Sequence, residues 1–208
     1  MTARVDKIVT SGRFALDGGS WDVDNNVWLI GDDAEVLVID APHDSDAILA
    51  AIGGRTVLAI VLTHGHNDHI NAAVELGRMT GAAVWFPPAD RMLWDVEHDS
   101  PPDKELHTGA TFTVAGTVLR AIPTPGHTPG SMCLYAEELG AVFTGDTLFA
   151  GGPGATGRSY SDFDTIIESI RERLLTLPDE TVVHTGHGDD TTIGAESSHV
   201  DEWTRPAA

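Results

Sequence analysis

The sequence predicts an α+β fold in which two β-sheets pack face to face and helices cover their outer faces. Short apolar or alternating runs bounded by Gly, Pro, Asn and Asp occur in both halves of the chain. Each half is strand-rich first and helical later, an order that two packed sheets with outer helices satisfy. No linker or low-complexity stretch separates the halves, so residues 1–208 are expected to form a single domain of two similar αβ halves.

Strands are expected in the first half wherever such a run lies between turn residues: Lys7–Phe14, Asn26–Ile30, Glu35–Ile39, Val57–Leu62 and Ala82–Phe86. Helices that stop at glycine are expected over residues 45–52 and Asn67–Thr80. Residues Ala89–Leu106, which carry Trp94 and two prolines, are expected to form an exposed segment with some helix.

The second half repeats the strand-rich pattern, with strands expected at Thr111–Val114, Thr117–Ile122, Ser131–Ala136, Gly140–Thr144 and Thr181–His184. The amphipathic stretch Asp162–Leu177 predicts a helix whose buried stripe includes Ile166, Ile170 and Leu174. A short helix over about residues 194–203 is expected to end the chain.

The composition of the chain limits the classes of molecule that it is expected to bind. The formal net charge is −20, from 32 acids against 12 bases, and such a field repels polyphosphate and anionic membrane surfaces. No stretch approaches the roughly 18 apolar residues of a membrane span, and the first residues lack a signal-peptide core. The single cysteine, Cys133, fits a reducing compartment and a packed strand. We expect a cytoplasmic protein with a small-molecule substrate and no nucleic acid or membrane partner; self-association stays open.

A cluster of histidine and aspartate follows the predicted strand Val57–Leu62. It holds His64, His66, Asp68 and His69 within six residues. So many polar groups at a buried strand end need compensation, and neutral imidazole with ionised carboxylate suits zinc or iron. A tight loop would point the first two histidines the same way, and the opening helical turn would present the other two residues on a second side. The loop is predicted to serve two neighbouring metals; alone, it also fits a solvated turn.

Three further polar signals stand at predicted strand ends beside Gly, Thr or Pro: His127 in Pro-Gly-His-Thr, Asp146 in Gly-Asp-Thr and His187 in Gly-His-Gly. With the first cluster, their order and context resemble the metallo-β-lactamase superfamily over nearly the whole chain. This resemblance implies the four-layer αββα sandwich of that family, which agrees with the two sheets expected from the pattern.

The resemblance also implies a binuclear metal site. The first metal would be held by His64, His66 and His127 and the second by Asp68, His69 and His187, with Asp146 bridging the two. Two divalent ions are implied, Zn²⁺ first, with Fe or Mn as alternatives. Asp40, at another strand end, is expected either to bond to loop amides or to support the metal loop.

The charge of such a site suits hydrolysis. Two divalent ions, two aspartates and a bridging hydroxide would leave a small positive charge, which attracts a carbonyl oxygen and stabilises the oxyanion formed when the hydroxide attacks. Metal coordination lowers the pKa of water from 15.7 to about 7, so no serine or cysteine nucleophile is needed. Asp68 is the expected catalytic residue, because it could orient the hydroxide while binding its metal.

Within the superfamily, the sequence looks most similar to the glyoxalase II-like thioester hydrolases. His66 stands where electron-transferring flavo-diiron relatives carry Glu. The β-lactamases lack the bridging aspartate that Asp146 matches and are usually exported. Nuclease members need a cationic face, which the net charge of −20 opposes.

One departure concerns the substrate. Glyoxalase II has a longer C-terminal helical region whose basic residues grip glutathione, whereas this sequence stops about twenty residues after His187. The arginine, alanine and glycine bias hints at a G+C-rich bacterial source. A thioester of another low-molecular-weight thiol is therefore expected, with S-acyl or S-formyl mycothiol as the candidate. Arg158, Tyr160 and Trp94 are the candidate substrate contacts, with structural roles as the alternative for each.

The main alternative function is persulfide dioxygenase, an oxidoreductase on the same fold. There a single iron is held by residues matching His64, His127 and Asp146, a two-histidine, one-carboxylate set with open positions for oxygen and a substrate sulfur. The other motif residues occur in both families, so the ligand set does not separate them. A lactonase is a further alternative. A non-catalytic module on this fold would show eroded ligands, and none is eroded here.

Overall fold

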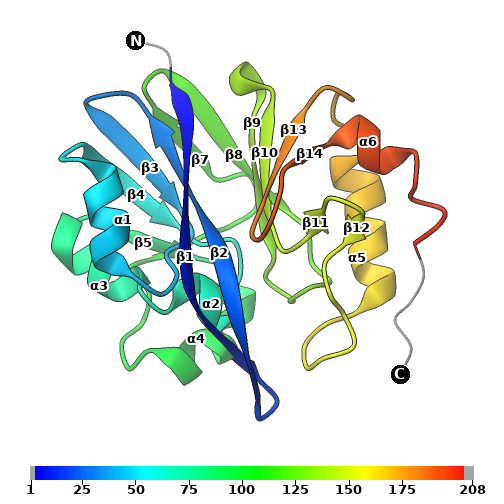
Figure 1. Ribbon diagram of the computed structural model, residues 1–208, viewed down its shortest axis with the longest axis horizontal. Helices are drawn as coiled ribbons and strands as arrows, with labels where there is room; N and C mark the ends of the chain where they lie inside the picture. Colours follow the sequence, from blue (N-terminus) through cyan, green and yellow to red (C-terminus); the bar gives the residue numbers. More distant parts are fainter. Residues whose placement is uncertain (1–2, 204–208) are drawn as a thin grey trace.

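Two six-stranded β-sheets form the centre of the computed structural model, which describes residues 3–203 (Figure 1). The first sheet runs in the order β1 (Arg4–Leu16), β2 (Gly19–Gly31), β3 (Glu35–Ile39), β4 (Thr56–Val61), β5 (Val84–Phe86) and β6 (Lys104–Glu105). The second runs in the order β14 (Thr191–Thr192), β13 (Val182–Thr185), β10 (Ala141–Gly145), β9 (Met132–Ala136), β8 (Thr117–Pro123) and β7 (Thr111–Val114). A separate ribbon consists of β11 (Leu148–Phe149) and β12 (Gly152–Pro153).

Helices cover the outer face of each sheet (Figure 1). The first sheet carries α1 (Ser45–Ile52), α2 (Asn67–Ile70), α3 (Ala73–Thr80) and, after the 3₁₀ turn η1 (Pro88–Asp90), α4 (Arg91–Glu97). The second sheet carries α5 (Phe163–Ser169), its π-helical continuation η3 (Ile170–Leu174) and α6 (Ile193–Ser197). A 3₁₀ turn, η2 (Glu137–Leu139), joins β9 to β10.

The side chains of β3 show how the layers stack. Val36 and Val38 belong to the apolar cluster between the first sheet and its helices. Leu37 and Ile39 belong to the cluster between the two sheets, where they meet side chains of the second sheet such as Phe143. Both faces of the strand are therefore buried. A third cluster fills the space between the second sheet and α5. The expected αββα sandwich is confirmed.

Parallel pairing collects the functional loops at one edge. In the first sheet β3 pairs parallel with β4, so the loops after these strands leave from the same edge. In the second sheet β10 pairs parallel with β13, which places the turns after Gly145 and Thr185 side by side. The two edges meet because the backbone N–H of Met132 donates to the carbonyl oxygen of Thr63 (2.8 Å). Segments far apart in sequence therefore share one edge.

Three helices differ from those expected. The helix predicted over Asn67–Thr80 is broken into α2 and α3, because the N–H of Ala72 donates to the carbonyl of Ala41 (3.0 Å) instead of continuing the helical ladder. The helix predicted over Asp162–Leu177 loses regular α geometry after Ser169. The last helix, α6, ends at Ser197 and is shorter than expected.

The segment Ala89–Leu106, predicted to be exposed, contributes to the core. The Trp94 side chain is fully buried, 4.8 Å from the Phe86 ring, and its indole N–H donates to the carbonyl of Ser100 (2.7 Å). Trp94 does not line the pocket over the histidine cluster. The prediction that Trp94 contacts substrate is therefore wrong. Its alternative, structural role is the one observed, since the side chain packs in the core.

Cys133 and the helix lengths bear on two expectations from composition. Cys133 is fully buried in β9, and burial raises the pKa of its thiol to about 11, as expected of a packed strand thiol. Among residues 3–203, no helix has both the length and the apolar character needed to cross a bilayer.

The buried position of Trp94 makes a stability prediction. We expect Trp94→Ala to lower the free energy of unfolding by about 3–5 kcal/mol, because it removes a large core side chain and leaves a cavity. The neighbouring control Val96→Ala, at a side chain that is 86% exposed, should change it by less than about 0.5 kcal/mol. Urea unfolding of both variants measures the difference. Equal losses would show that Trp94 is not part of the core.

Candidate metal centre

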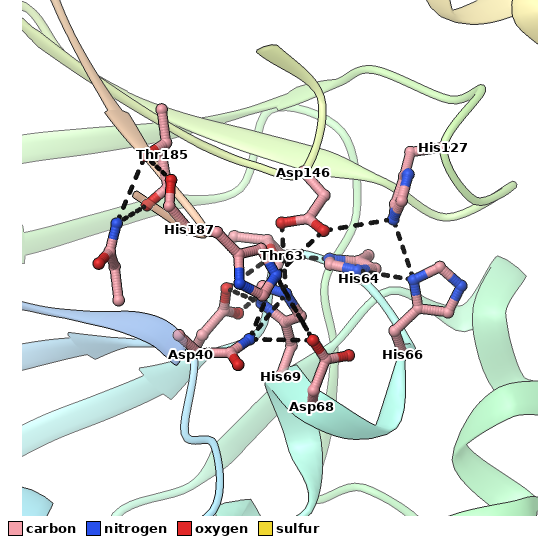
Figure 2. A network of polar contacts seen from close by, with 12 residues as sticks. Asp40, Thr63, His64, His66, Asp68, His69, His127, Asp146, Thr185 and His187 are labelled. Carbon is pink, nitrogen blue, oxygen red and sulfur yellow. Dashed lines mark hydrogen bonds and ion pairs between the residues drawn. The ribbon is translucent and has the colours of Figure 1, made fainter. Parts of the chain in front are cut away.

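Seven imidazole and carboxylate side chains gather where the edges of the two sheets meet (Figure 2). The first sheet supplies His64 and His66 from the loop after β4 and Asp68 and His69 from α2. The second sheet supplies the others from the loops that follow β8, β10 and β13: His127, Asp146 and His187. Figure 2 shows these seven side chains gathered around one centre. The structure thus brings together every residue that the sequence motifs predict as a metal ligand.

Three imidazoles form the first group. The Nδ1 atom of His66 lies 3.1 Å from Nε2 of His64 and 2.9 Å from Nε2 of His127. All three side chains are almost completely buried. Burial lowers the pKa of each imidazole, that of His66 to about 3. They are therefore neutral, which is the form that binds a metal.

The second group contains two imidazoles and a carboxylate. The Nε2 atoms of His69 and His187 are 3.3 Å apart, and Nε2 of His187 lies 3.4 Å from Oδ2 of Asp68. Burial alone would lower the pKa of His187, but the carboxylates of Asp146 and Asp68 raise it to about 10. Burial opposes ionisation of Asp68 as well, yet His69 and His187 lower its pKa to about 2. The carboxylates therefore stay ionised and attract positive charge.

Asp146 lies between the two groups. Its Oδ1 is 3.3 Å from Nε2 of His69, and its Oδ2 is 3.5 Å from Nε2 of His127 and 3.4 Å from Nε2 of His187. The side chain can therefore reach both groups at once. A Cβ atom at Gly186 would collide with Oδ1 of Asp146, so glycine is required at that position.

These residues fit divalent cations. Within each group the donor atoms lie within 4.8 Å of one another. Among residues 3–203, Oδ1 of Asp68 and Oδ1 of Asp146 are buried without a hydrogen-bond partner, which is costly unless a cation compensates them. Facing nitrogens of neutral imidazoles likewise cannot all be satisfied by hydrogen bonds to one another. The donor set of nitrogen and carboxylate oxygen suits zinc or iron.

In three of the rings the outer nitrogen, Nδ1, is held so that Nε2 faces the centre. The Nδ1–H of His69 donates to Oδ2 of Asp40 (2.8 Å), and that of His127 to the carbonyl of Ala155 (2.9 Å). The Nδ1–H of His187 donates to the carbonyl of Asp24 (2.7 Å). Such partners fix the tautomer that leaves Nε2 free for a metal.

Asp40 supports the metal loop in both of the ways considered from the sequence. Its Oδ1 accepts from the backbone N–H of Thr63 (2.7 Å), and its Oδ2 accepts from the Thr63 hydroxyl (2.8 Å) as well as from His69. It therefore holds the start of the loop and one candidate ligand together.

Asn25 is a site residue that sequence reasoning missed. The backbone N–H of His43 donates to Oδ1 of Asn71 (2.6 Å), so Nδ2 of Asn71 faces Nδ1 of His43 (3.2 Å) and donates to it. The remaining ring nitrogen, Nε2, must then donate to Oδ1 of Asn25 (2.9 Å). This chain of donors directs Nδ2 of Asn25 to Oδ2 of Asp68 (3.1 Å). His43, which matches no ligand position, thus orients the amide that positions Asp68.

Asp90 is the second missed residue. Its buried carboxylate accepts three hydrogen bonds, from the N–H of Gly65 (2.8 Å), the hydroxyl of Thr128 (2.6 Å) and the N–H of Gly130 (2.6 Å). A Cβ atom at Gly130 would lie 2.7 Å from Cγ of Asp90, so this close approach requires glycine. Burial raises the pKa of Asp90 although these donors act against the rise. Asp90 joins the two loops that supply His64, His66 and His127.

A pocket of about 260 Å³ opens onto five of the seven residues: His66, Asp68, His127, Asp146 and His187. Its walls include Phe14, Trp21 and Val23 from the β1–β2 hairpin and Arg158 from the loop before α5. The Arg158 guanidinium lies 3.9 Å from the centre of the Trp21 ring. Arg158 is thus placed at the pocket, whereas Tyr160 lines an adjoining hollow. A larger hollow beside α3 is lined by none of the seven residues.

The three hydrogen bonds to Asp90 make a testable prediction. We expect Asp90→Ala to lower the free energy of unfolding by about 2–5 kcal/mol, because it leaves buried donors of both loops without an acceptor. Asp95→Ala is the matched control, since that exposed carboxylate makes an ion pair with Arg91 on the same helix, and it should change stability by less than about 1 kcal/mol. Urea unfolding of metal-free protein measures both. Similar small losses of unfolding free energy in both variants would show that Asp90 does not hold the two loops together.

Known proteins share this architecture. The family model described as the metallo-beta-lactamase superfamily matches residues 21–187. Hydroxyacylglutathione hydrolase GloC from Haemophilus influenzae is 32% identical over 188 residues, covering 82% of this chain and 89% of the relative. The solved structure of TTHA1623 in a di-iron-bound form superimposes with a TM-score of 0.75 at 32% identity, covering 84% of this chain and 93% of that one. ETHE1 from Myxococcus xanthus gives a TM-score of 0.71 at 29% identity, with 92% and 83% covered. The chain belongs to the metallo-β-lactamase superfamily.

Proposed function

We propose that the protein is a metal-dependent hydrolase that cleaves a thioester of a low-molecular-weight thiol in the cytoplasm. The observation that carries this proposal is the complete donor set of two groups, with Asp146 within 3.5 Å of nitrogens in both. Similarity to a protein named hydroxyacylglutathione hydrolase supports the thioester class. The excess of acids, 32 against 12 bases, supports a small substrate rather than nucleic acid.

The residues of the site have distinct proposed roles. Two divalent cations, when bound, lower the pKa of a coordinated water and polarise a carbonyl oxygen. The first would be held by His64, His66 and His127 and the second by Asp68, His69 and His187, with Asp146 contacting both. Zn²⁺ is the proposed metal; the di-iron form of TTHA1623 makes iron the first alternative, with manganese after it.

Asp68 is the proposed catalytic residue. Its Oδ2 accepts from Nδ2 of Asn25, while its buried Oδ1 has no hydrogen-bond partner among residues 3–203. One oxygen is therefore fixed and the other is available to orient the nucleophile. The apolar walls formed by Phe14, Trp21 and Val23 would exclude water around the acyl group. Arg158, stacked on Trp21, is proposed to contact the substrate at the rim.

The second part of the proposed substrate is the thiol that carries the acyl group. S-acyl or S-formyl mycothiol is the proposed candidate, and the arginine, alanine and glycine bias of the sequence, which is typical of a G+C-rich bacterial source, supports it. Tyr160 is 51% exposed in the hollow beside the pocket, where a carrier would extend.

Persulfide dioxygenase is the second candidate function. A single iron could be held by His64, His127 and Asp146, and the structure places the rings of the two histidines 5.0 Å apart with Asp146 beside His127. Similarity to ETHE1 from Myxococcus xanthus is the reason for retaining the dioxygenase as a candidate. A lactonase is the third.

Metal content and turnover of protein purified without chelators separate the candidates. The proposed function predicts about two metal ions per chain and hydrolysis of S-acyl thioesters, with thiol release followed colorimetrically. One iron per chain with oxygen consumption on a persulfide would contradict it and support the dioxygenase.

The position of Asp146 between the two donor groups leads to a specific prediction. We expect Asp146→Ala to weaken the binding of both metals by at least about 100-fold and to remove nearly all turnover, because the side chain lies between both donor groups. His107→Ala, at an exposed imidazole, is the control. Chelator competition and circular dichroism report affinity and folding. Wild-type affinity for either metal in a folded variant would show that Asp146 does not serve both.

A further inference from the structure

A second hollow, of about 440 Å³, adjoins the metal pocket. The two share His66 and Ser159 in their linings, so they lie side by side. The metal pocket alone, at about 260 Å³, is smaller than the roughly 300–1,000 Å³ of typical small-molecule sites. A thioester whose acyl group lies at the metal centre would therefore place its carrier in the second hollow.

The walls of this hollow combine apolar surface with a fixed rim. The tip of the β1–β2 hairpin, residues 15–19, forms one wall, and Met92 and Val96 of α4 form another. These two side chains are 41% and 86% exposed, so they are available to a ligand. The N–H of Ser159 donates to Oδ2 of Asp17 (3.1 Å), which joins the hairpin tip to the loop between the two cavities.

The charges that line the hollow have one sign. Apart from His66 and the phenol of Tyr160, its ionisable side chains are Asp17 and Glu97, and no lysine or arginine among the described residues lines it. Contacts with Ser159, and then the Arg158 guanidinium, lower the pKa of Asp17, so this carboxylate is ionised. Arg158 itself lines the metal pocket, where it stacks on Trp21. The whole chain adds a formal charge of −20.

We propose that the second hollow binds the thiol carrier and selects an uncharged carrier over an anionic one. This inference rests on the proposed thioester hydrolysis. A carboxylate on the carrier would meet Asp17 and Glu97, and no lysine or arginine among the described residues lines the hollow to pair with it, which is a repulsive element against anionic ligands. Hydroxyl and amide groups of an uncharged carrier would instead find carboxylate acceptors, and its carbon skeleton would contact Met92 and Tyr160.

A matched pair of substrates tests the selectivity. The S-acetyl thioesters of N-acetylcysteine methyl ester and of N-acetylcysteine differ in a single carboxylate. We expect kcat/KM of the metal-loaded enzyme to be at least about 5-fold higher for the uncharged ester at low salt, and the ratio to fall toward one as salt screens the repulsion. Equal values at low salt, or a preference for the anionic substrate, would overturn the inference.

Charge reversal locates the effect. Glu97→Lys should raise the value for the anionic substrate relative to the uncharged one by about 3- to 10-fold. Glu138→Lys changes the net charge by the same amount but lies on η2, after the end of β9 that is remote from the metal loops, and should leave the ratio unchanged. The same shift in both variants would mean that the whole-chain field, and not this hollow, discriminates.

A different experimental result would show that the proposed function, rather than this inference, is wrong. If neither thioester is hydrolysed by metal-loaded protein, thioester hydrolysis is wrong, and binding of the S-ethyl thioethers of the same two carriers still decides the selectivity. Ligand-observed NMR should then show tighter binding of the uncharged thioether, weakened by Leu16→Glu at the wall of the hollow. Equal binding of the two thioethers would overturn the inference.

Discussion

The structure depends on a buried set of electron-pair donors that cannot satisfy one another. Imidazole nitrogens face each other at 2.9–3.3 Å, and the Asp146 carboxylate stands between the two groups. In a low-dielectric interior such a set is stable only if positive charge compensates it. The surrounding geometry serves this need, since each outer ring nitrogen of His69, His127 and His187 donates to a fixed oxygen and turns the inner nitrogen toward the centre.

The site is also the place where the two halves of the molecule are joined. Asp40 holds Thr63 and His69 within the first half, whereas Asp90 accepts from loops of both halves. A metal held by ligands from both sheets would add a further link across the same boundary. Binding and folding should therefore be coupled, because displacement of either sheet separates the donors. The pocket above is completed in the same way, by the hairpin of the first sheet and the loop before α5.

The sequence was sufficient for the sandwich and for the seven converging residues because both have local signatures. Apolar runs end at Gly, Thr or Pro, and the polar residue that follows each run marks the edge of a sheet. The supporting residues have no such signature: Asp90 meets partners 25 to 40 positions away, and Asn25 is oriented through His43 and Asn71. The segment around Trp94 was expected to be exposed because no local pattern shows its burial, which depends on tertiary packing against Phe86. The break in the helix after Ile70 likewise depends on a hydrogen bond from Ala72 to Ala41, which no local pattern reveals.

Anomalous diffraction from crystals grown with the metal that copurifies is the most direct test of the central claim. The account predicts two peaks, one bordered by His64, His66 and His127 and the other by Asp68, His69 and His187, with the Asp146 carboxylate touching both. A single peak between His64, His127 and Asp146, or an arrangement in which these side chains turn away from any metal, would contradict it.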